Sequence, residues 1–236
     1  MSALRKAALE DLLRVRRLQA DAPPLRGEAR RAPLSTGIAP LDALLAGGLP
    51  RGQLSEIHGP ASSGRTGLAL AAAAHATRSG TLAAWVDPAD RLDPASAAAA
   101  GVDLSRLLWL RGDEGAGRGR VLADSVSAAG TVLGAGLFDL VVLDLAGLAG
   151  IDINRLPGAT WIRLQRAVAD TPVALLLLAA AHVAQGPGGV RLELPAGQPR
   201  WSGLPGPGRL LRGLGATARA GRHSVRSAAF ELHAVD

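Results

Sequence analysis

Residues 54–79 of the chain read LSEIHGPASSGRTGLALAAAAHATRS. An apolar stretch over residues 54–58 is followed by a loop rich in glycine and serine, and then by a helix-forming run over residues 66–79. A loop between a strand and a helix can bind phosphate, because its backbone N–H groups and the amino-terminal end of the helix act as hydrogen-bond donors. The stretch therefore predicts a phosphate-binding loop in an α/β domain.

One position of this loop departs from the strict pattern, which ends in glycine, lysine and then serine or threonine. Arg65 stands at the lysine position, between Gly64 and Thr66. Lysine offers a compact charge to the β- and γ-phosphates, whereas the planar guanidinium group is larger and favours two-pronged contacts. General arginine enrichment is the alternative explanation, since Lys6 is the only lysine of the chain. The candidate nucleotide site comprises Gly59, Ser62, Ser63, Gly64, Arg65, Thr66 and Asp144.

Apolar runs and helical stretches alternate on both sides of this loop. Strands are predicted over residues 54–58, 82–86, 107–110, 140–143 and 173–180. Helices are predicted between them over residues 66–79, 94–100, 121–133 and 161–169. Apolar strands joined by helical crossovers pair in parallel and are covered on both faces. The pattern predicts an α/β fold, with a mostly parallel central sheet and helices on both faces.

The chain divides into a core and two extensions. Residues 1–34 are predicted to form an amphipathic helix, over residues 2–20, and a basic linker, because Leu4, Leu12, Val15 and Leu18 recur at helical spacing. Residues 35–184 form the predicted core. Residues 185–236 are rich in glycine, proline and arginine, with short strands predicted over residues 191–194, 215–219 and 230–234.

The positive charge is concentrated in the two extensions. Residues 1–34 carry eight Arg/Lys and four Asp/Glu, residues 35–184 carry eleven and thirteen, and residues 185–236 carry seven and three. Each end is therefore +4 and the core is −2 within the net charge of +6. Basic ends on a neutral core are typical of proteins that bind nucleic acid or an acidic partner, and arginine-rich coding bias is the alternative.

Composition excludes several classes of protein. The absence of cysteine excludes disulfides, thiolate metal sites and a cysteine nucleophile. The five histidines lack metal-ligand spacing. No apolar run approaches the roughly 18 residues that a membrane span needs, so a cytoplasmic protein is expected.

Several motifs around the phosphate loop occur in the order found in one family. They are LSTGIAPLD at residues 34–42, GGLPRG at 47–52, WVD at 85–87, LDP at 92–94, GVDLSRLL at 101–108 and FDLVVLD at 138–144. This series resembles the RecA recombinase family and implies a RecA-like P-loop domain. The short chain, the altered loop and the basic tail are most similar to the ImuA branch, also called SulA-like. Its members are linked to damage-induced mutagenesis beside ImuB, a relative of Y-family polymerases.

The resemblance indicates that a catalytic side chain is missing. Active members carry a glutamate that polarises the attacking water two residues after an aspartate, and this aspartate corresponds to Asp87. The glutamate position is Ala89, which cannot accept a proton, and loss of a general base typically costs about 10²–10⁴ in rate. Asp90 is adjacent but shorter and displaced by one residue, so it is the alternative base.

Two further positions lack side chains that the family uses. Ser96 stands where a tyrosine packs on adenine, and Ala180 or Ala181 stands where a glutamine couples the nucleotide to the DNA-binding loops. Thr66 and Asp144 still form the pair that would hold Mg²⁺, although an aspartate at a strand end is also a common cap. Together these losses imply a pseudo-ATPase.

The segments that bind single-stranded DNA in the family are short and nearly uncharged here. They correspond to residues 145–158 and 183–189, in which Arg155 is the only basic residue. Exposed aromatic rings stack on bases in many single-strand binding proteins. Trp201, beside Arg200, is the aromatic candidate, and a buried structural role is its alternative.

The carboxyl-terminal tail supplies a second group of candidate contacts. Arg219, Arg222 and Arg226 can share one side only if the chain turns between Ala220 and Ser224. Convergence would give a patch for phosphate or for an acidic peptide, and a solvated surface is the alternative. The candidate DNA or partner contacts are Arg200, Trp201, Arg219, Arg222, Arg226, Leu4, Leu12, Val15 and Leu18.

These features favour a non-catalytic RecA-like accessory factor in the DNA damage response and translesion mutagenesis. Its expected partners are a RecA-type recombinase, the ImuB-like polymerase relative and single-stranded DNA. No cofactor is expected to be required, while ATP with Mg²⁺ is compatible with Thr66 and Asp144. A recombinase paralogue that binds or slowly hydrolyses ATP is the alternative. A division inhibitor is a third hypothesis, suggested only by the name of the SulA-like family.

Overall fold

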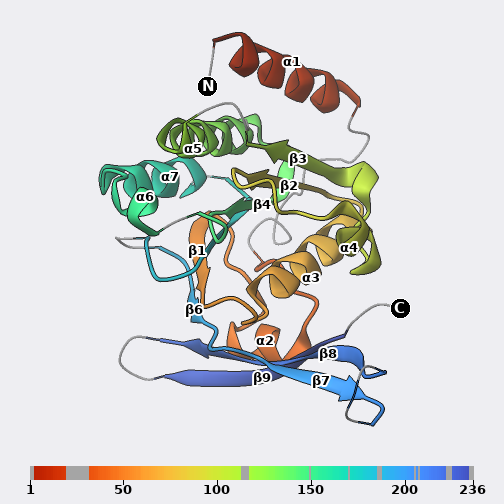
Figure 1. Ribbon diagram of the computed structural model, residues 1–236. Coiled ribbons are helices and arrows are strands. Elements are labelled where there is room, and N and C mark those ends of the chain that lie inside the picture. The colour runs from red at the N-terminus through yellow and green to blue at the C-terminus, as the bar shows by residue number, and fades with distance from the viewer. Residues whose placement is uncertain are drawn as a thin grey trace.

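A nine-stranded sheet forms the centre of the computed structural model (Figure 1). The structure describes residues 3–19, 32–112, 117–148, 150–169, 171–184, 188–204, 206, 208–221 and 225–233. Its parallel part contains β1 (Gln53–His58), β2 (Leu82–Asp87), β3 (Leu107–Arg111), β4 (Phe138–Asp144) and β5 (Ala174–Ala179). The strand order β3-β2-β4-β5-β1 continues into β6-β8-β7, and β9 pairs with β8. The predicted α/β fold with a mostly parallel sheet is confirmed.

The central strands β4 and β5 are buried on both faces. Val142 and Leu176 pack into one hydrophobic cluster, whereas Val141 and Leu175 pack into the cluster on the opposite face. Alternate residues of a strand point to opposite faces, so an unbroken apolar run is suited to a strand that is covered on both sides.

Helices cover the two faces of the sheet as separate layers (Figure 1). The first layer contains α2 (Ala39–Leu44), α3 (Arg65–Arg78) and α4 (Pro94–Ala99). The second contains α1 (Ala3–Gln19), α5 (Arg118–Ala135), α6 (Gly150–Asn154) and α7 (Ala159–Ala169). Within the described ranges, none of the helices has the length and apolar character needed to span a bilayer.

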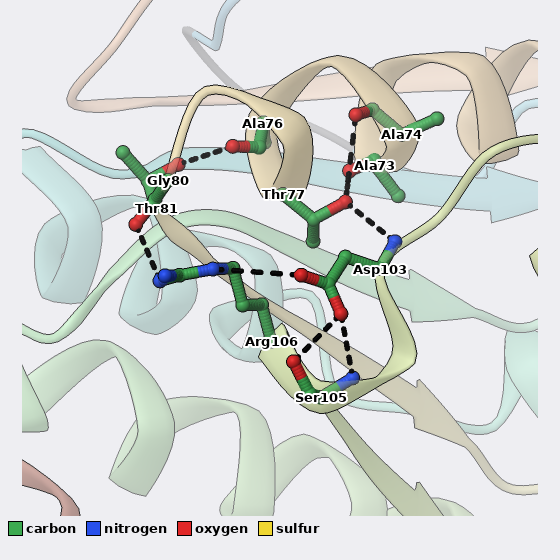
Figure 2. A network of polar contacts seen from close by, with 9 residues as sticks. All are labelled: Ala73, Ala74, Ala76, Thr77, Gly80, Thr81, Asp103, Ser105 and Arg106. Carbon is green, nitrogen blue, oxygen red and sulfur yellow. Dashed lines mark hydrogen bonds and ion pairs between the residues drawn. The ribbon is translucent and has the colours of Figure 1, made fainter.

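A polar network anchors the end of α3 to the segment that precedes β3 (Figure 2). The Thr77 hydroxyl donates to the Ala73 carbonyl at 2.8 Å and accepts from the Asp103 N–H at 3.1 Å. Arg106, in the short 3₁₀ helix η2 (Leu104–Arg106), lies 3.5 Å from the Asp103 carboxylate and donates to the Gly80 carbonyl at 2.7 Å. The network fixes the helix that begins at the phosphate loop.

The carboxyl-terminal strands extend the sheet with antiparallel pairs. They are β6 (Arg191–Glu193), β7 (Gln198–Ser202), β8 (Leu210–Ala220) and β9 (Arg226–His233), all paired through β8, and β6 also pairs in parallel with β1. The predicted strands in this region are present, and β8 is longer than expected. The strand β7 was not predicted because Pro199 interrupts its pattern, and within the described residues it lies at the edge of the sheet, where proline is tolerated.

The amino-terminal helix packs on its own chain. Leu9 and Leu13 are buried in the cluster that contains α5, whereas Leu12 and Val15 are exposed. The side chains of Leu4 and Leu18 lie outside the described residues. The buried stripe is therefore offset from the predicted stripe through Leu12 and Val15, because the contact face follows the Leu9 and Leu13 side of the helix.

Candidate nucleotide site

The predicted phosphate loop joins β1 to α3, as its sequence context indicates. Ser62 and Gly64 adopt left-handed backbone conformations, with φ of 59° and 90°, and α3 begins directly at Arg65. Glycine adopts this conformation without steric cost, which suits the residue immediately before the helix. The loop thus retains a turn that leads into the amino-terminal end of α3.

The Arg65 side chain is bonded to the loop itself. Its guanidinium Nη1 donates to the Gly59 carbonyl at 2.5 Å and also to the Pro60 carbonyl. Partial burial lowers the pKa of the Arg65 guanidinium, and the Asp144 carboxylate acts in the opposite direction. The positive group at the lysine position is therefore directed at the carbonyl groups of its own loop.

Asp144 and Thr66 lie near the loop but in different environments. Asp144 ends β4, is buried, and accepts the Ala146 N–H at 3.0 Å. Burial raises the pKa of the Asp144 carboxyl, the Ala146 N–H opposes this, and the Asp87 carboxylate adds to the rise. Thr66 is exposed in the first turn of α3. Asp144 caps a local turn, while its charge interacts with Arg65.

The two carboxylates at the end of β2 and just after it, those of Asp87 and Asp90, are engaged in local contacts. Asp87 Oδ2 accepts the N–H groups of Arg91 and Leu92, each at 2.8 Å, and the Trp109 Nε1–H at 3.2 Å, whereas its buried Oδ1 has no hydrogen-bond partner among the described residues. Asp90 has a left-handed φ of 51° and forms an ion pair with Arg111 of β3. The carboxylate of the alternative base is therefore occupied by an arginine.

Ser96 has a structural role in α4. Its backbone N–H and its hydroxyl group both donate to the Asp93 carboxylate, at 2.9 Å and 2.5 Å. Asp93 is the residue before the helix, and a side-chain oxygen there satisfies the free N–H groups of the first turn. These bonds lower the pKa of Asp93, the hydroxyl of Ser96 contributing most.

The connection between β6 and β7, together with β9, lies against the phosphate loop and the first turn of α3, a contact that the sequence did not indicate. The Gly197 N–H donates to the Ser62 carbonyl at 2.9 Å. A Cβ added to Gly59 would lie 2.0 Å from the Leu194 carbonyl oxygen. The Leu232 side chain of β9 would meet a Cβ at Gly67 at 2.6 Å. Residues more than 130 positions away therefore cover the loop.

A buried glutamate next to the loop was also missed. Glu56 of β1 accepts the Val183 N–H at 2.7 Å and the Ala184 N–H at 3.3 Å, and its Oε2 lies 2.5 Å from His182 Nδ1. The strand before the phosphate loop is thus bonded to the segment after β5. The pairing of β1 with β5 is the signal, because it brings the carboxyl ends of both strands together.

The structure separates the predicted basic residues of the tail. Arg219 pairs with Ser227, whereas Arg226 pairs with Ala220, so Arg219 and Arg226 point to opposite faces of the β8–β9 pair. The convergence that the sequence left open does not occur for this pair, because the side chains of a strand alternate between its two faces. Arg222 lies outside the described residues. Arg200 and Trp201 are on β7 and exposed.

Residues 27–152, more than half of the chain, match the RecA N-terminal domain family. The chain belongs to this family. Protein RecA from Streptococcus pyogenes and from Streptococcus uberis are each 42% identical to it over 120 residues. This alignment covers 50% of the RecA-family chain but 30% of each relative, so the chain spans about a third of the length of these relatives.

In this chain, the candidate nucleotide site is formed by the loop between β1 and α3 and by Asp144 at the end of β4. Its two halves come from segments that the sequence placed correctly. No group of three or more His, Cys, Asp or Glu side chains arranged to hold a metal ion occurs among the described residues.

Proposed function

We propose that this RecA-family chain is a non-catalytic accessory factor of DNA repair, with a phosphate loop that does not turn over ATP. The main support is the orientation of the Arg65 side chain, which donates to the Gly59 and Pro60 carbonyls. In this orientation the Arg65 side chain donates to the loop, whereas a lysine at the same position directs its N–H groups at phosphate.

The surroundings of Asp87 support the same proposal. Ala89 has no proton acceptor, and Asp90 is paired with Arg111 rather than free to activate water. A general base must lie within hydrogen-bond reach of the proton that it removes. Ser96, which is bonded to Asp93, supplies no ring for a nucleotide base.

The resemblance to the ImuA branch defines the proposed setting. The chain acts in the DNA damage response and in SOS-induced translesion mutagenesis, through contacts with a RecA-type recombinase, with an ImuB-like polymerase relative or with DNA. The pseudo-ATPase core acts as a folded platform in this role and requires no cofactor.

A second candidate is a recombinase paralogue that binds ATP and hydrolyses it slowly. It is favoured by the retained left-handed turn at Gly64, by the exposed Thr66 and by the buried Asp144. If ATP and Mg²⁺ bind, Thr66 and Asp144 are the residues that would hold the metal ion.

Steady-state ATP hydrolysis separates the two candidates. We expect the wild-type protein to release no more phosphate than the Thr66→Ala variant, with or without single-stranded DNA, because neither Arg65 nor Ala89 can perform the family role. The Thr66→Ala variant also controls for contaminating ATPases. Turnover that DNA stimulates in the wild type and that Thr66→Ala abolishes would overturn the proposal and establish the second candidate.

A further inference from the structure

The distal part of the β7–β8 hairpin exposes a group of large apolar side chains. The exposed fractions are 47% for Trp201, 87% for Leu204, 57% for Leu210 and 49% for Leu211. The other aromatic side chains are buried or half-buried, namely Trp85, Trp109, Trp161, Phe138 and Phe230. Large apolar groups clustered on a surface mark contact sites more reliably than isolated ones do.

Strand pairing brings two of these side chains, Trp201 and Leu211, together. Trp201 lies opposite Leu211, and Ser202 lies opposite Leu210, in an antiparallel ladder. Alternation places Trp201 and Leu211 on one face of the hairpin and Leu210 on the other. The hairpin end is therefore apolar on both faces, and it lies at the periphery of the molecule (Figure 1). Further along β8, Ala216 is buried against the core.

The charge of the hairpin is of one sign. Its sequence from β7 to the start of β8 contains Arg200, Arg209 and Arg212 but no Asp or Glu. The Arg209 guanidinium carbon lies 5.1 Å from the centre of the Trp201 ring, a cation–π geometry. Arg200 is paired at 3.2 Å with Glu231 of β9, and Arg212 donates to the Ser202 hydroxyl at 2.8 Å, so Arg209 is the basic residue that lies against Trp201.

The backbone of β7 is poorly suited to pairing with an added strand. Pro199 has no N–H to donate, and the register with β8 shifts between Arg200 and Trp201. Interrupted edges of this kind discourage strand addition. Recognition at this hairpin must therefore rely on side chains.

We propose that this hairpin end docks an amphipathic protein segment whose leucine-like side chains are flanked by carboxylates. The docking surface, here called the arm patch, is the face that carries Trp201 and Leu211, with Arg209 stacked on the Trp201 ring and the exposed Leu204 in the connection between the two strands. Exposed leucines need apolar partners, and guanidinium forks pair with carboxylates in two-pronged contacts. Tryptophan and arginine are the residue types that dominate the energy of protein interfaces. The inference rests on the proposed function in that it treats the chain as a factor that acts through protein contacts.

Fluorescence anisotropy with defined peptides tests the proposal. The probe is a labelled synthetic helix of about 18 residues with leucine on one face and glutamate beside it, and its partner probe has lysine in place of glutamate. We expect the full-length chain to bind the acidic peptide. Trp201→Ala should weaken binding roughly 30-fold, as the loss of a central aromatic contact does. The charge reversal Arg209→Glu should make the chain bind the lysine peptide more tightly than the acidic peptide.

Matched variants on α7, at the far end of the molecule, control for general surface effects (Figure 1). Ile162→Ala removes an exposed apolar side chain, and Arg163→Glu reverses one exposed charge. These variants should leave peptide affinity within about twofold, since exposed residues away from a contact are nearly neutral. None of the variants touches the phosphate loop, so the ATP result and this result can fail separately.

Three outcomes would overturn the proposal. The first is absence of binding to the acidic peptide. The second is that the α7 variants lose as much affinity for this peptide as Trp201→Ala does. The third is tighter, Trp201-dependent binding of oligodeoxythymidylate of about 30 nucleotides, or of anionic lipid vesicles, which would assign the patch to nucleic acid or to a membrane. Thermal melts of each variant verify that the fold is intact.

Discussion

Arg65 in the phosphate loop and Arg209 in the arm patch both lie next to a glycine in the sequence, yet their guanidinium groups have different partners. Arg65 donates to carbonyls of its own loop and is half-buried. Arg209 is exposed and lies against the ring of Trp201. The loop has the motif of a binding site, but the Arg65 side chain is bonded to the carbonyl groups of the loop itself. The arm patch has no motif and leaves its apolar and cationic groups in solvent.

This difference teaches that a binding motif and a free binding surface are separate properties. A motif specifies backbone shape, whereas availability depends on what the rest of the chain places against that backbone. At the loop, Leu194, Gly197 and Leu232 lie against it. At the arm patch, the large apolar side chains are exposed, and exposed groups of this kind are available to a partner.

The largest expected effect is on the free energy of unfolding, when a glycine is replaced by alanine in each of the two regions. Gly59→Ala should lower the free energy of unfolding by about 3 kcal/mol, because the added Cβ overlaps the Leu194 carbonyl. Gly208→Ala in the arm meets no atom within 4 Å and should change it by less than about 0.5 kcal/mol. Urea denaturation of both variants measures the difference. Equal stabilities would mean that the strands over the loop do not pack as described.

A smaller effect concerns the pH dependence of stability. Burial raises the pKa of Asp144 in the folded state, so the folded protein holds a proton at pH values where the unfolded chain has lost it. Stability then falls as pH rises from the ordinary value of 3.8 through the raised pKa. Asp144→Asn should therefore be more stable than the wild type near pH 7, by about 1 kcal/mol, and no different at pH values below 3.8.

The matched carboxylate near the arm patch is Glu231. It is exposed and paired with Arg200, so Glu231→Gln should change stability by no more than about 0.5 kcal/mol. Denaturation curves collected from about pH 3 to about pH 8 check both variants, because this range extends to both sides of ordinary carboxyl pKa values. The burial argument would be contradicted if the difference in free energy of unfolding between Asp144→Asn and the wild type stayed constant across this range, or if Asp144→Asn were less stable than the wild type at pH 7.

An effect of similar size separates the two arginines. Arg65→Ala should reduce the free energy of unfolding by about 1 kcal/mol, since two bonds to loop carbonyls are lost. Arg209→Ala should stay within about 0.5 kcal/mol because its side chain is exposed. If Arg65→Ala proves neutral, the guanidinium does not stabilise the loop, and the contrast between the regions disappears.

Local sequence patterns were sufficient for most of the core. The apolar run that forms β4 and the small-residue run that forms α3 were predicted to within about two residues, a normal uncertainty for helix and strand ends. The strand β7 and the short helices α2 and α6 were not predicted. Pro199 masks the first, and elements as short as α6 have too few residues for a periodic signal.

The sequence by itself determined the strand–loop–helix order, the substitution at Arg65 and the missing carboxylate at Ala89, because these depend on residue identity and local spacing. Tertiary structure alone decided that Arg65 turns onto its own loop, that Leu194 and Leu232 cover that loop, and that Arg219 and Arg226 face apart. The physical reason is range. Backbone propensity and side-chain periodicity act over a few residues, whereas strand register and packing join residues that are distant along the chain, and no local pattern encodes them.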